Sequence, residues 1–456
     1  MHQTKIEVRI SAKRSMSSES QSVSCVVGKD VHIDYGFLED SLFKNVGDRE
    51  FDVFTLIGTV EFADRRFRRL LGKGWAREFS LRVPVASPEF WNRKLVGGIL
   101  AETLHFLTGD QWEFRFERRH RDVPRKVQPG LSFERKGPFH VLPYSDGMDS
   151  CILEQLSRHR NPWVQQLRVT AWNQSLSAEK KFDHDGGGFR IPIPIRSEIG
   201  THPELTFRTR PFKFLMLCAL AAKSTESSRI LIPENGQGIL SPVLTPKGAE
   251  WIYWGVHPAF TTRLRRFIEN ALGYSVAFEH PHIWRTKGRM LTELLSINGQ
   301  WQSTRSCSSN PRHGILIDGK RVHCGICANC LLRRLSLHTA GVGADAEPYV
   351  WQHLDAASFE GALHRNAPRR NHNRRKYYFD VAVNAIFAAD DFASLLDLAN
   401  GNDAIDRHAY QLDALGYCPR EEARENIRNL IRTHKEEWES FLASLPAHSW
   451  VRKVVG

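Results

Sequence analysis

The sequence lacks a long hydrophobic run. Its longest apolar stretch lies near residues 214–222 and falls far short of the ~20 residues that a membrane-spanning helix needs. The beginning of the chain mixes charged residues with serines and shows no apolar core of signal-peptide length. These absences argue against a membrane protein and predict a cytoplasmic location.

Cysteine is also scarce, with 8 residues in a chain of 456. This number is too small for a disulfide scaffold, and a cytosolic setting would keep most of the thiols reduced. Cysteines that stand singly are commonly small core residues. We expect that role for Cys25, Cys151, Cys218 and Cys418.

Acidic residues are outnumbered, since 51 Asp and Glu face 63 Lys and Arg, for a formal charge of +12. This excess favours polyanionic partners such as nucleotides, nucleic acid or pyrophosphate. The length of the chain predicts two or three compact units.

Short strand-like runs at residues 31–33, 53–57 and 79–83 dominate the first part of the chain. A helix is predicted from Pro88 onward, and Thr108-Gly109-Asp110 should end it before another strand. Residues 1–136 are therefore predicted to form an N-terminal α+β domain.

Strands and helices alternate in the middle of the chain, which predicts a parallel sheet with helices on both faces. Ligands of such sheets bind at the carboxyl ends of the strands. The predicted strands are 139–142, 167–171 and 230–232, and the predicted helices are 150–159, 211–223, 261–272 and 287–296. This pattern defines a predicted α/β domain at 137–345, followed by a helical C-terminal region at 346–456.

A strand, a tight turn and a helix meet at residues 141–156. Such a turn directs backbone N–H groups and the positive end of a helix dipole at one point, which suits a phosphate. Ser145 and Ser150 can add hydroxyl donors, and Asp149 can hold Mg²⁺. A plain helix cap made by Asp149 and Ser150 is the alternative. The chain has no Walker-type loop.

Four cysteines cluster in sequence, with two-residue gaps between the last three: Cys307, Cys324, Cys327 and Cys330. Four thiolates make a closed tetrahedral site for structural Zn²⁺. An iron–sulfur cluster and a metal-free thiol cluster are the alternatives. His313 and His323 stand nearby and could replace a ligand.

The turn at 145–150 resembles the Ser-Gly-Gly-x-Asp-Ser signature of the PP-loop ATP pyrophosphatases. Followed by Thr286-Lys287 before a helix and then by the cysteine pattern, it resembles the QueC-like (7-cyano-7-deazaguanine synthase) family of PP-loop ATPases over residues 138–343. The resemblance assigns ATP binding to Ser145, Asp146, Gly147, Met148, Asp149 and Ser150.

The resemblance implies a PP-loop fold and a defined chemistry. Members of the family adenylate the carboxylate of 7-carboxy-7-deazaguanine and use ammonia to form an amide and then a nitrile, with ATP, Mg²⁺ and a structural zinc. Asp149 and Lys287 would be the catalytic residues, and Lys287 would meet the pyrophosphate. A solvated lysine at a helix start is the alternative for Lys287.

Departures from the family predict an altered substrate pocket. Asp146 replaces a glycine of the signature, and both Trp172-Asn173-Gln174 and Pro233-Glu234-Asn235-Gly236 replace family segments. The added N- and C-terminal regions make the chain about twice the length of a biosynthetic member of the family, and in this the chain resembles a QueC-like component of a bacterial anti-phage system. That resemblance implies partner proteins of a defence operon, one of which could supply the amino group that accepts the activated carboxylate.

Two further functions stay open. Basic clusters at 65–69, 115–126 and 364–376 would suit a PP-loop tRNA-modifying enzyme, although a solvated linker or a protein-docking patch is the simpler reading. A nucleotide-sensing scaffold that has lost turnover through Asp146 is the other alternative.

Overall fold

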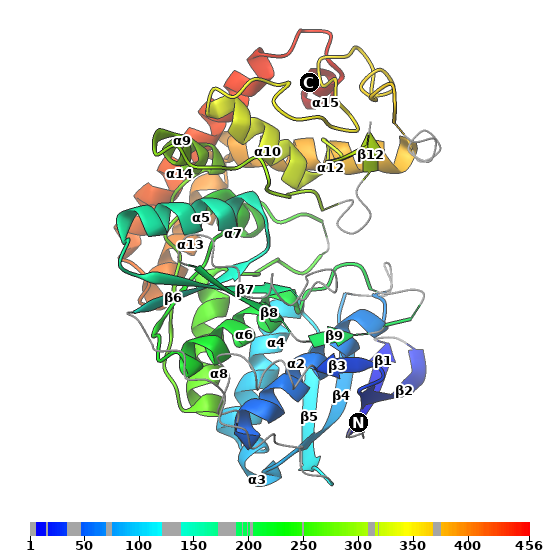
Figure 1. The fold of residues 1–456 in the computed structure, drawn as a ribbon. Helices are drawn as coiled ribbons and strands as arrows, with labels where there is room; N and C mark the ends of the chain where they lie inside the picture. The colour runs from blue at the N-terminus through cyan, green and yellow to red at the C-terminus, as the bar shows by residue number, and fades with distance from the viewer. Residues whose placement is uncertain are drawn as a thin grey trace. The chain divides into compact units, whose positions relative to one another are not determined.

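The computed structural model describes residues 6–14, 17–33, 47–69, 75–120, 138–171, 188–193, 195–197, 199–200, 204–248, 250–308, 315–317, 319–367 and 375–456. The chain forms two compact units built from segments that are not consecutive (Figure 1). The N-terminal unit comprises Met1–Ser145, Arg158–Ile232 and Lys247–Pro281. The C-terminal unit comprises Asp146–Ser157, Pro233–Pro246 and His282–Gly456. The domain boundaries at 136 and 345 stay a prediction.

The N-terminal unit contains a mixed sheet of six strands in the order β5-β4-β1-β2-β3-β9. β4 pairs with β5 in parallel, whereas β1 pairs antiparallel with both β2 and β4. The strands are β1 (Ile6–Arg14), β2 (Ser17–Val27), β3 (Val31–Ile33), β4 (Arg77–Val85), β5 (Gln111–Arg118) and β9 (Ile195–Ser197). β3 and β4 confirm the strands predicted at 31–33 and 79–83.

The strand predicted at 53–57 is wrong, because these residues lie inside helix α2 (Asp48–Arg66). Their aromatic and β-branched side chains favour a strand locally. The helix nevertheless buries every residue from Phe51 to Asp64, so tertiary packing overrides that preference. Acidic residues in its first turn and Arg65 and Arg66 in its last turn suit the helix dipole.

The helix predicted from Pro88 is divided into α3 (Pro88–Trp91), the π-helix η1 (Lys94–Gly98) and α4 (Ile99–Thr108). Gly109 ends α4 in the left-handed conformation, with a φ of 74°, which confirms the predicted stop.

The second sheet of this unit is parallel throughout and has five strands in the order β11-β10-β6-β7-β8. Helix α6 (Arg210–Ser224) packs against β6, β7 and β10, and α8 (Pro258–Leu272) packs against β11. The strands are β6 (Phe139–Tyr144), β7 (Gln165–Ala171), β8 (Gly188–Ile193), β10 (Arg229–Leu231) and β11 (Ala277–Glu279). The predicted alternation of strands and helices is confirmed in this region.

A buried ionic network ties α2 to the turn between α4 and β5. The guanidinium of Arg77 donates to Asp64 at 2.6 Å and to Asp110 at 2.7 Å, and Arg69 donates to Asp110 at 2.5 Å. Both aspartate side chains are fully buried. Loss of one partner would leave an uncompensated buried charge and would destabilise the unit strongly.

The C-terminal unit is mostly helical, which confirms the predicted helical C-terminal region. Its central helices are α14 (Arg420–Ala443), which packs against α10, α12 and α13, and α9 (Lys287–Ser296), which packs against α10. The remaining elements are α5 (Met148–Arg160, from its start to Ser157), α7 (Gly236–Leu244), β12 (Ile315–Ile317), β13 (Lys320–Val322), α10 (Ala328–Thr339), α12 (Arg375–Ala393), the 3-10 helix η4 (Leu395–Asp397), α13 (Gly401–Ala414) and α15 (Trp450–Val455). Within the described ranges, no helix combines the length and the apolar character of a membrane span.

Candidate active site and metal centre

The loop at 145–150 joins β6 to α5, as predicted. Ser145 and Asp146 are exposed, and the carbonyl of Asp146 accepts a hydrogen bond from the backbone N–H of Arg305 at 2.8 Å. Asp146 has a φ of 55°, in the left-handed region that favours glycine. Its backbone therefore has the conformation suited to the glycine that the resembled signature carries at this position.

Two other predicted loop residues, Met148 and Ser150, differ in what they can offer a ligand. The side chain of Met148 is fully buried among Ile152 and Met290, so only its backbone could meet a phosphate. Ser150 donates its hydroxyl hydrogen to the carbonyl of Gly147 at 3.1 Å, which closes the loop.

Asp149 is the point at which three separate segments meet. Its Oδ2 lies 2.8 Å from Nζ of Lys287, and its Oδ1 accepts a hydrogen bond from Nδ2 of Asn235 at 2.8 Å. The side chain of Asp149 is 18% exposed, whereas that of Lys287 is 4% exposed. The structure thus brings together Asp149 and Lys287, the two residues predicted to be catalytic.

Lys287 is the first residue of α9, and its place is set by the cap of that helix. Thr286 is the N-cap and accepts a hydrogen bond from the backbone N–H of Arg289 at 3.2 Å. The backbone N–H of Lys287 donates to Oε1 of Gln237 at 2.8 Å. Because Lys287 is buried and paired with Asp149, it is not the solvated helix-start lysine of the alternative reading.

Asn235 belongs to a segment that departs from the family, but the sequence assigns no role to this residue itself. It is the N-cap of α7, where its Oδ1 accepts from the backbone N–H of Gly238 at 3.0 Å. An asparagine before a glycine indicates a turn or a cap. The contact of its Nδ2 with Asp149, 86 residues away, has no local signal.

This arrangement can hold an anion and a metal ion together. A lysine ammonium neutralises phosphate oxygens, and a carboxylate oxygen is a ligand that Mg²⁺ prefers. Lys287 already balances the charge of Asp149, so a phosphate that draws Nζ toward itself would free Oδ2 for the metal. Asp149 could then be a ligand of Mg²⁺.

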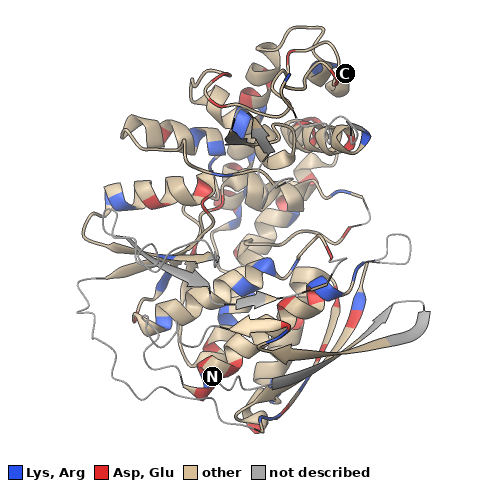
Figure 2. Ribbon diagram, turned by 45° about the vertical axis from the view of Figure 1, so that its right-hand side comes forward, with Lys and Arg blue, Asp and Glu red and all other residues tan. Residues whose placement is uncertain are grey.

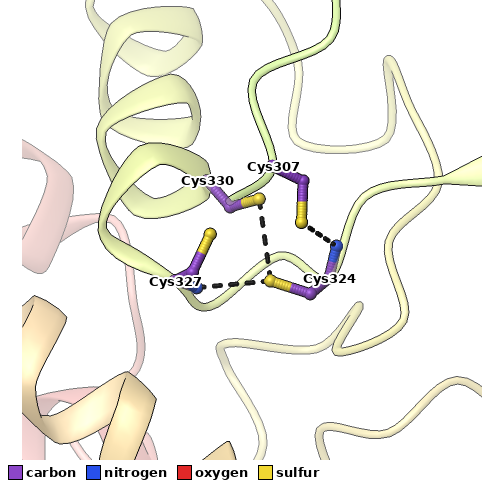
Figure 3. Close-up of side chains that lie close together, drawn as sticks. All are labelled: Cys307, Cys324, Cys327 and Cys330. Atoms are coloured by element: carbon purple, nitrogen blue, oxygen red, sulfur yellow. Dashed lines mark hydrogen bonds between the residues drawn. The ribbon is translucent and has the colours of Figure 1, made fainter. Parts of the chain in front are cut away.

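The four clustered cysteines turn their sulfurs toward one another (Figure 3). All four Sγ atoms lie within 4.8 Å of one another, and those of Cys324 and Cys330 are 3.7 Å apart. A tetrahedron with bonds of ~2.3 Å to zinc has edges of ~3.8 Å, so the spacing fits a zinc ion. Such a site would need no ligand beyond these four thiolates.

Backbone geometry supports this site. The N–H of Cys324 points at Sγ of Cys307 at 3.5 Å, and that of Cys327 points at Sγ of Cys324 at 3.4 Å. Gly325 between them has a φ of 89°, and a Cβ there would lie 2.8 Å from the carbonyl of Trp351.

His323 does not join the cysteine cluster. Its Nε2 accepts from the backbone N–H of Ser306 at 3.4 Å, and its Nδ1 faces Glu347 at 3.8 Å. His313 lies outside the described residues. The cluster therefore comprises the cysteines alone among the described side chains.

Lysine and arginine positions are interspersed with aspartate and glutamate positions along the described elements (Figure 2). The predicted basic clusters are partly neutralised by ion pairs. Arg65 pairs with Glu61, Arg69 is buried in the ionic network, and Arg119 pairs with Asp52 at 3.0 Å. The ranges 121–126 and 368–374 of the other basic clusters, and Trp172-Asn173-Gln174, lie outside the described residues. Pairing with acids reduces the positive field that these arginines could offer to nucleic acid.

Part of the chain is similar to 7-cyano-7-deazaguanine synthases. The protein of that name from Ruegeria pomeroyi is 34% identical over 116 residues, which are 25% of this chain and 46% of that protein. Its namesake from Paracoccus denitrificans is 33% identical over 110 residues, 24% of this chain and 42% of that protein. The chain thus spans less than half the length of these relatives. No family model and no solved structure matches it.

Proposed function

We propose that this protein uses ATP to adenylate a carboxylate and passes the activated acyl group to an amine. The observation that carries the proposal is the ion pair between the buried Lys287 and the partly exposed Asp149, 2.8 Å apart, at a loop that resembles a PP-loop. The partial similarity to 7-cyano-7-deazaguanine synthases supports a QueC-like ATP-dependent synthase.

The proposed reaction has two steps. A carboxylate oxygen of the substrate attacks the α-phosphorus of ATP, the bond from that phosphorus to the bridging oxygen breaks, and pyrophosphate leaves. The amine then attacks the acyl carbon, loses a proton, and releases AMP that carries the oxygen of the former carboxylate. Lys287 would stabilise the charge that develops on the leaving pyrophosphate.

The loop supplies the rest of the proposed nucleotide site. Backbone N–H groups of Gly147 and Met148, with the hydroxyl of Ser145, would face phosphate oxygens at the start of α5. Asp146 would contribute its left-handed backbone to the turn, and its exposed side chain can turn to solvent. Mg²⁺ held by Asp149 would offset the charge of the polyphosphate.

The four cysteines would hold a structural zinc ion. Such an ion stabilises the surrounding fold directly, and no open ligand position is needed. It would fix the start of α10 relative to the loop that carries Cys307. We assign it no part in the chemical step.

The finer proposal concerns substrate and context. We propose a 7-deazaguanine-type carboxylate as the substrate and a role in anti-phage defence like that of QatC, the QueC-like component of a bacterial defence system. The acceptor would be ammonia or an amino group on a partner protein of the same operon. Incubation with substrate, ATP and candidate partners should add deazaguanine mass to one partner or yield the amide or nitrile.

Pyrophosphate release tests the proposal. The purified protein should release pyrophosphate from ATP when 7-carboxy-7-deazaguanine is added. Asp149→Ala and Lys287→Ala should each lower that rate by roughly 100-fold or more, because each removes a charge beside the phosphates. Asp345→Ala, which changes an exposed aspartate of the same unit, is the matched control.

Other outcomes point to other functions. ATP binding without pyrophosphate release under any condition would indicate a nucleotide-sensing scaffold. Salt-sensitive binding of tRNA, with pyrophosphate release only in its presence, would indicate a tRNA-modifying enzyme.

A further inference from the structure

The cap of α9 is held by a side chain from α14. The hydroxyl of Thr286 donates a hydrogen bond to Oε1 of Glu437 at 2.6 Å while it accepts one from Arg289. Glu437 is 6% exposed, and its Oε2 has no hydrogen-bond partner. Thr286 directly precedes Lys287, so Glu437 acts on the backbone from which the lysine side chain extends.

A second connection runs from Lys287 through α7 to α14. The backbone N–H of Lys287 donates to Oε1 of Gln237, and Nε2 of Gln237 donates to Nδ1 of His434 at 2.8 Å. Nε2 of His434 lies 2.9 Å from the carbonyl of Ala389. An amide nitrogen can only donate and a carbonyl can only accept, so the imidazole is neutral with its proton on Nε2. Burial also lowers the pKa of His434 to about 4.

Side chains of α14 also lie against the starts of α7 and α9. A Cβ on Gly236, the first residue of α7, would lie 2.7 Å from Leu430. A Cβ on Gly288 would lie 2.8 Å from Oε1 of Glu437. The two residues that contact Asp149, Asn235 and Lys287, each stand directly before one of these glycines.

We propose that His434 and Glu437 are positioning residues for Lys287, so that α14 of the C-terminal region is an integral part of the site around Asp149. The inference rests on the proposed function, because it assumes that Lys287 meets the nucleotide phosphates. His434 acts through Gln237 and Glu437 acts through Thr286.

A lysine needs such support because its charge sits at the end of a flexible four-carbon stem. Its backbone must be fixed if Nζ is to reach a phosphate reproducibly, and small misplacements of catalytic groups cost large factors in rate. The two connections fix the backbone on both sides of the bond between Thr286 and Lys287, from one helix.

The test compares disruptive and conservative variants of the full-length protein. Glu437→Ala and His434→Leu remove the acceptors of Thr286 and Gln237. Glu437→Gln and His434→Asn keep an acceptor oxygen at each place. Glu439→Ala is the matched control, since Glu439 lies on the same helix and is exposed.

Two readouts are needed. The first is the split between kcat and KM for ATP in pyrophosphate release, and the second is hydrogen–deuterium exchange of the peptide covering residues 282–292. The disruptive variants should lower kcat about tenfold with little change in KM, and should speed exchange about tenfold at the start of α9. The conservative variants should recover most of both losses, and Glu439→Ala should match the wild type.

The outcomes separate this inference from the proposed function. An active wild-type protein whose kcat and exchange at α9 are unchanged in both disruptive variants would overturn the positioning role. A wild-type protein that releases no pyrophosphate would instead overturn the proposed function. In that second case, hydrogen–deuterium exchange at the start of α9 would by itself decide whether α14 holds the start of this helix.

Discussion

Asp146 occupies a backbone conformation that costs most residues free energy. Its φ of 55° is tolerated by aspartate better than by other residues, and glycine adopts it freely. We expect Asp146→Gly to raise the melting temperature slightly, by the equivalent of about 1 kcal/mol, and Asp146→Val to lower it. Thermal unfolding of both variants measures this. A melting temperature that falls with glycine and is unchanged with valine would contradict the assigned backbone.

Glu437 should make the stability of the protein depend on pH. Burial raises the pKa of Glu437 from 4.5 to about 7, although the Thr286 hydroxyl and Arg289 oppose the shift and Glu436 adds to it. As pH rises from 4.5 to 7, the unfolded chain loses this proton before the folded protein does. The contribution of Glu437 to the free energy of unfolding is therefore fully present below pH 4.5, and it is lost as pH rises through about 7.

Glu437→Gln removes this dependence because glutamine does not ionise. Relative to the wild type, its melting temperature should rise between pH 5 and pH 8, with a free-energy difference of at most about 3 kcal/mol. For Glu439→Gln, at an exposed position, the difference in melting temperature from the wild type should stay constant between pH 5 and pH 8. If the melting temperature of Glu437→Gln relative to the wild type does not change with pH, the carboxyl group of Glu437 is already ionised at pH 5, which would contradict its raised pKa.

The sequence identified part of the candidate site at the residue scale. Asp149 and Lys287 stand in recognisable patterns, one before a helix and one after a cap residue, and the structure places them 2.8 Å apart. Asn235, Gln237 and Glu437 stand in no pattern that reveals a ligand site. Their contacts join residues 50 to 151 positions apart, which local propensity does not encode.

At the scale of elements, the wrong prediction for α2 shows where composition misleads. Five residues rich in Val, Phe and Ile look like a strand when they are considered alone. The acidic first turn at Asp48 and Glu50 and the basic end at Arg65 and Arg66 indicate a helix, but only over the full length of 19 residues.

At the scale of elements, the cysteine cluster predicts that the protein contains zinc and is stabilised by it. The protein should contain one zinc ion per chain, and its removal by a chelator should lower the melting temperature, because metal binding stabilises the folded state. Cys327→Ser should reduce zinc content and stability together. Cys418→Ser is the matched control, since Cys418 stands apart from the cluster.

Metal analysis and visible absorbance decide among the alternatives. Iron in the protein, together with visible absorbance, would show that the four cysteines hold an iron–sulfur cluster and not zinc. A chain that carries no metal, and whose melting temperature a chelator does not change, would leave a thiol cluster without a metal role.

At the scale of the whole molecule, the alternation of strands and helices was sufficient to predict a parallel sheet and a helical C-terminal region. It did not reveal that the loop after β6, the turn at Asn235 and the start of α9 belong to the same compact unit as α14. Sequence order separates these segments, and only long-range packing brings them into one unit.

The central claim is that a carboxylate of the substrate becomes joined to the α-phosphorus of ATP at this site. The most direct measurement uses 7-carboxy-7-deazaguanine labelled with oxygen-18 in its carboxylate, with mass spectrometry of the AMP released. The account predicts AMP that carries one oxygen-18 atom in the wild type, and formation of this labelled AMP at a rate roughly 100-fold lower or less in Lys287→Ala. Unlabelled AMP, or ADP as the product, would contradict it.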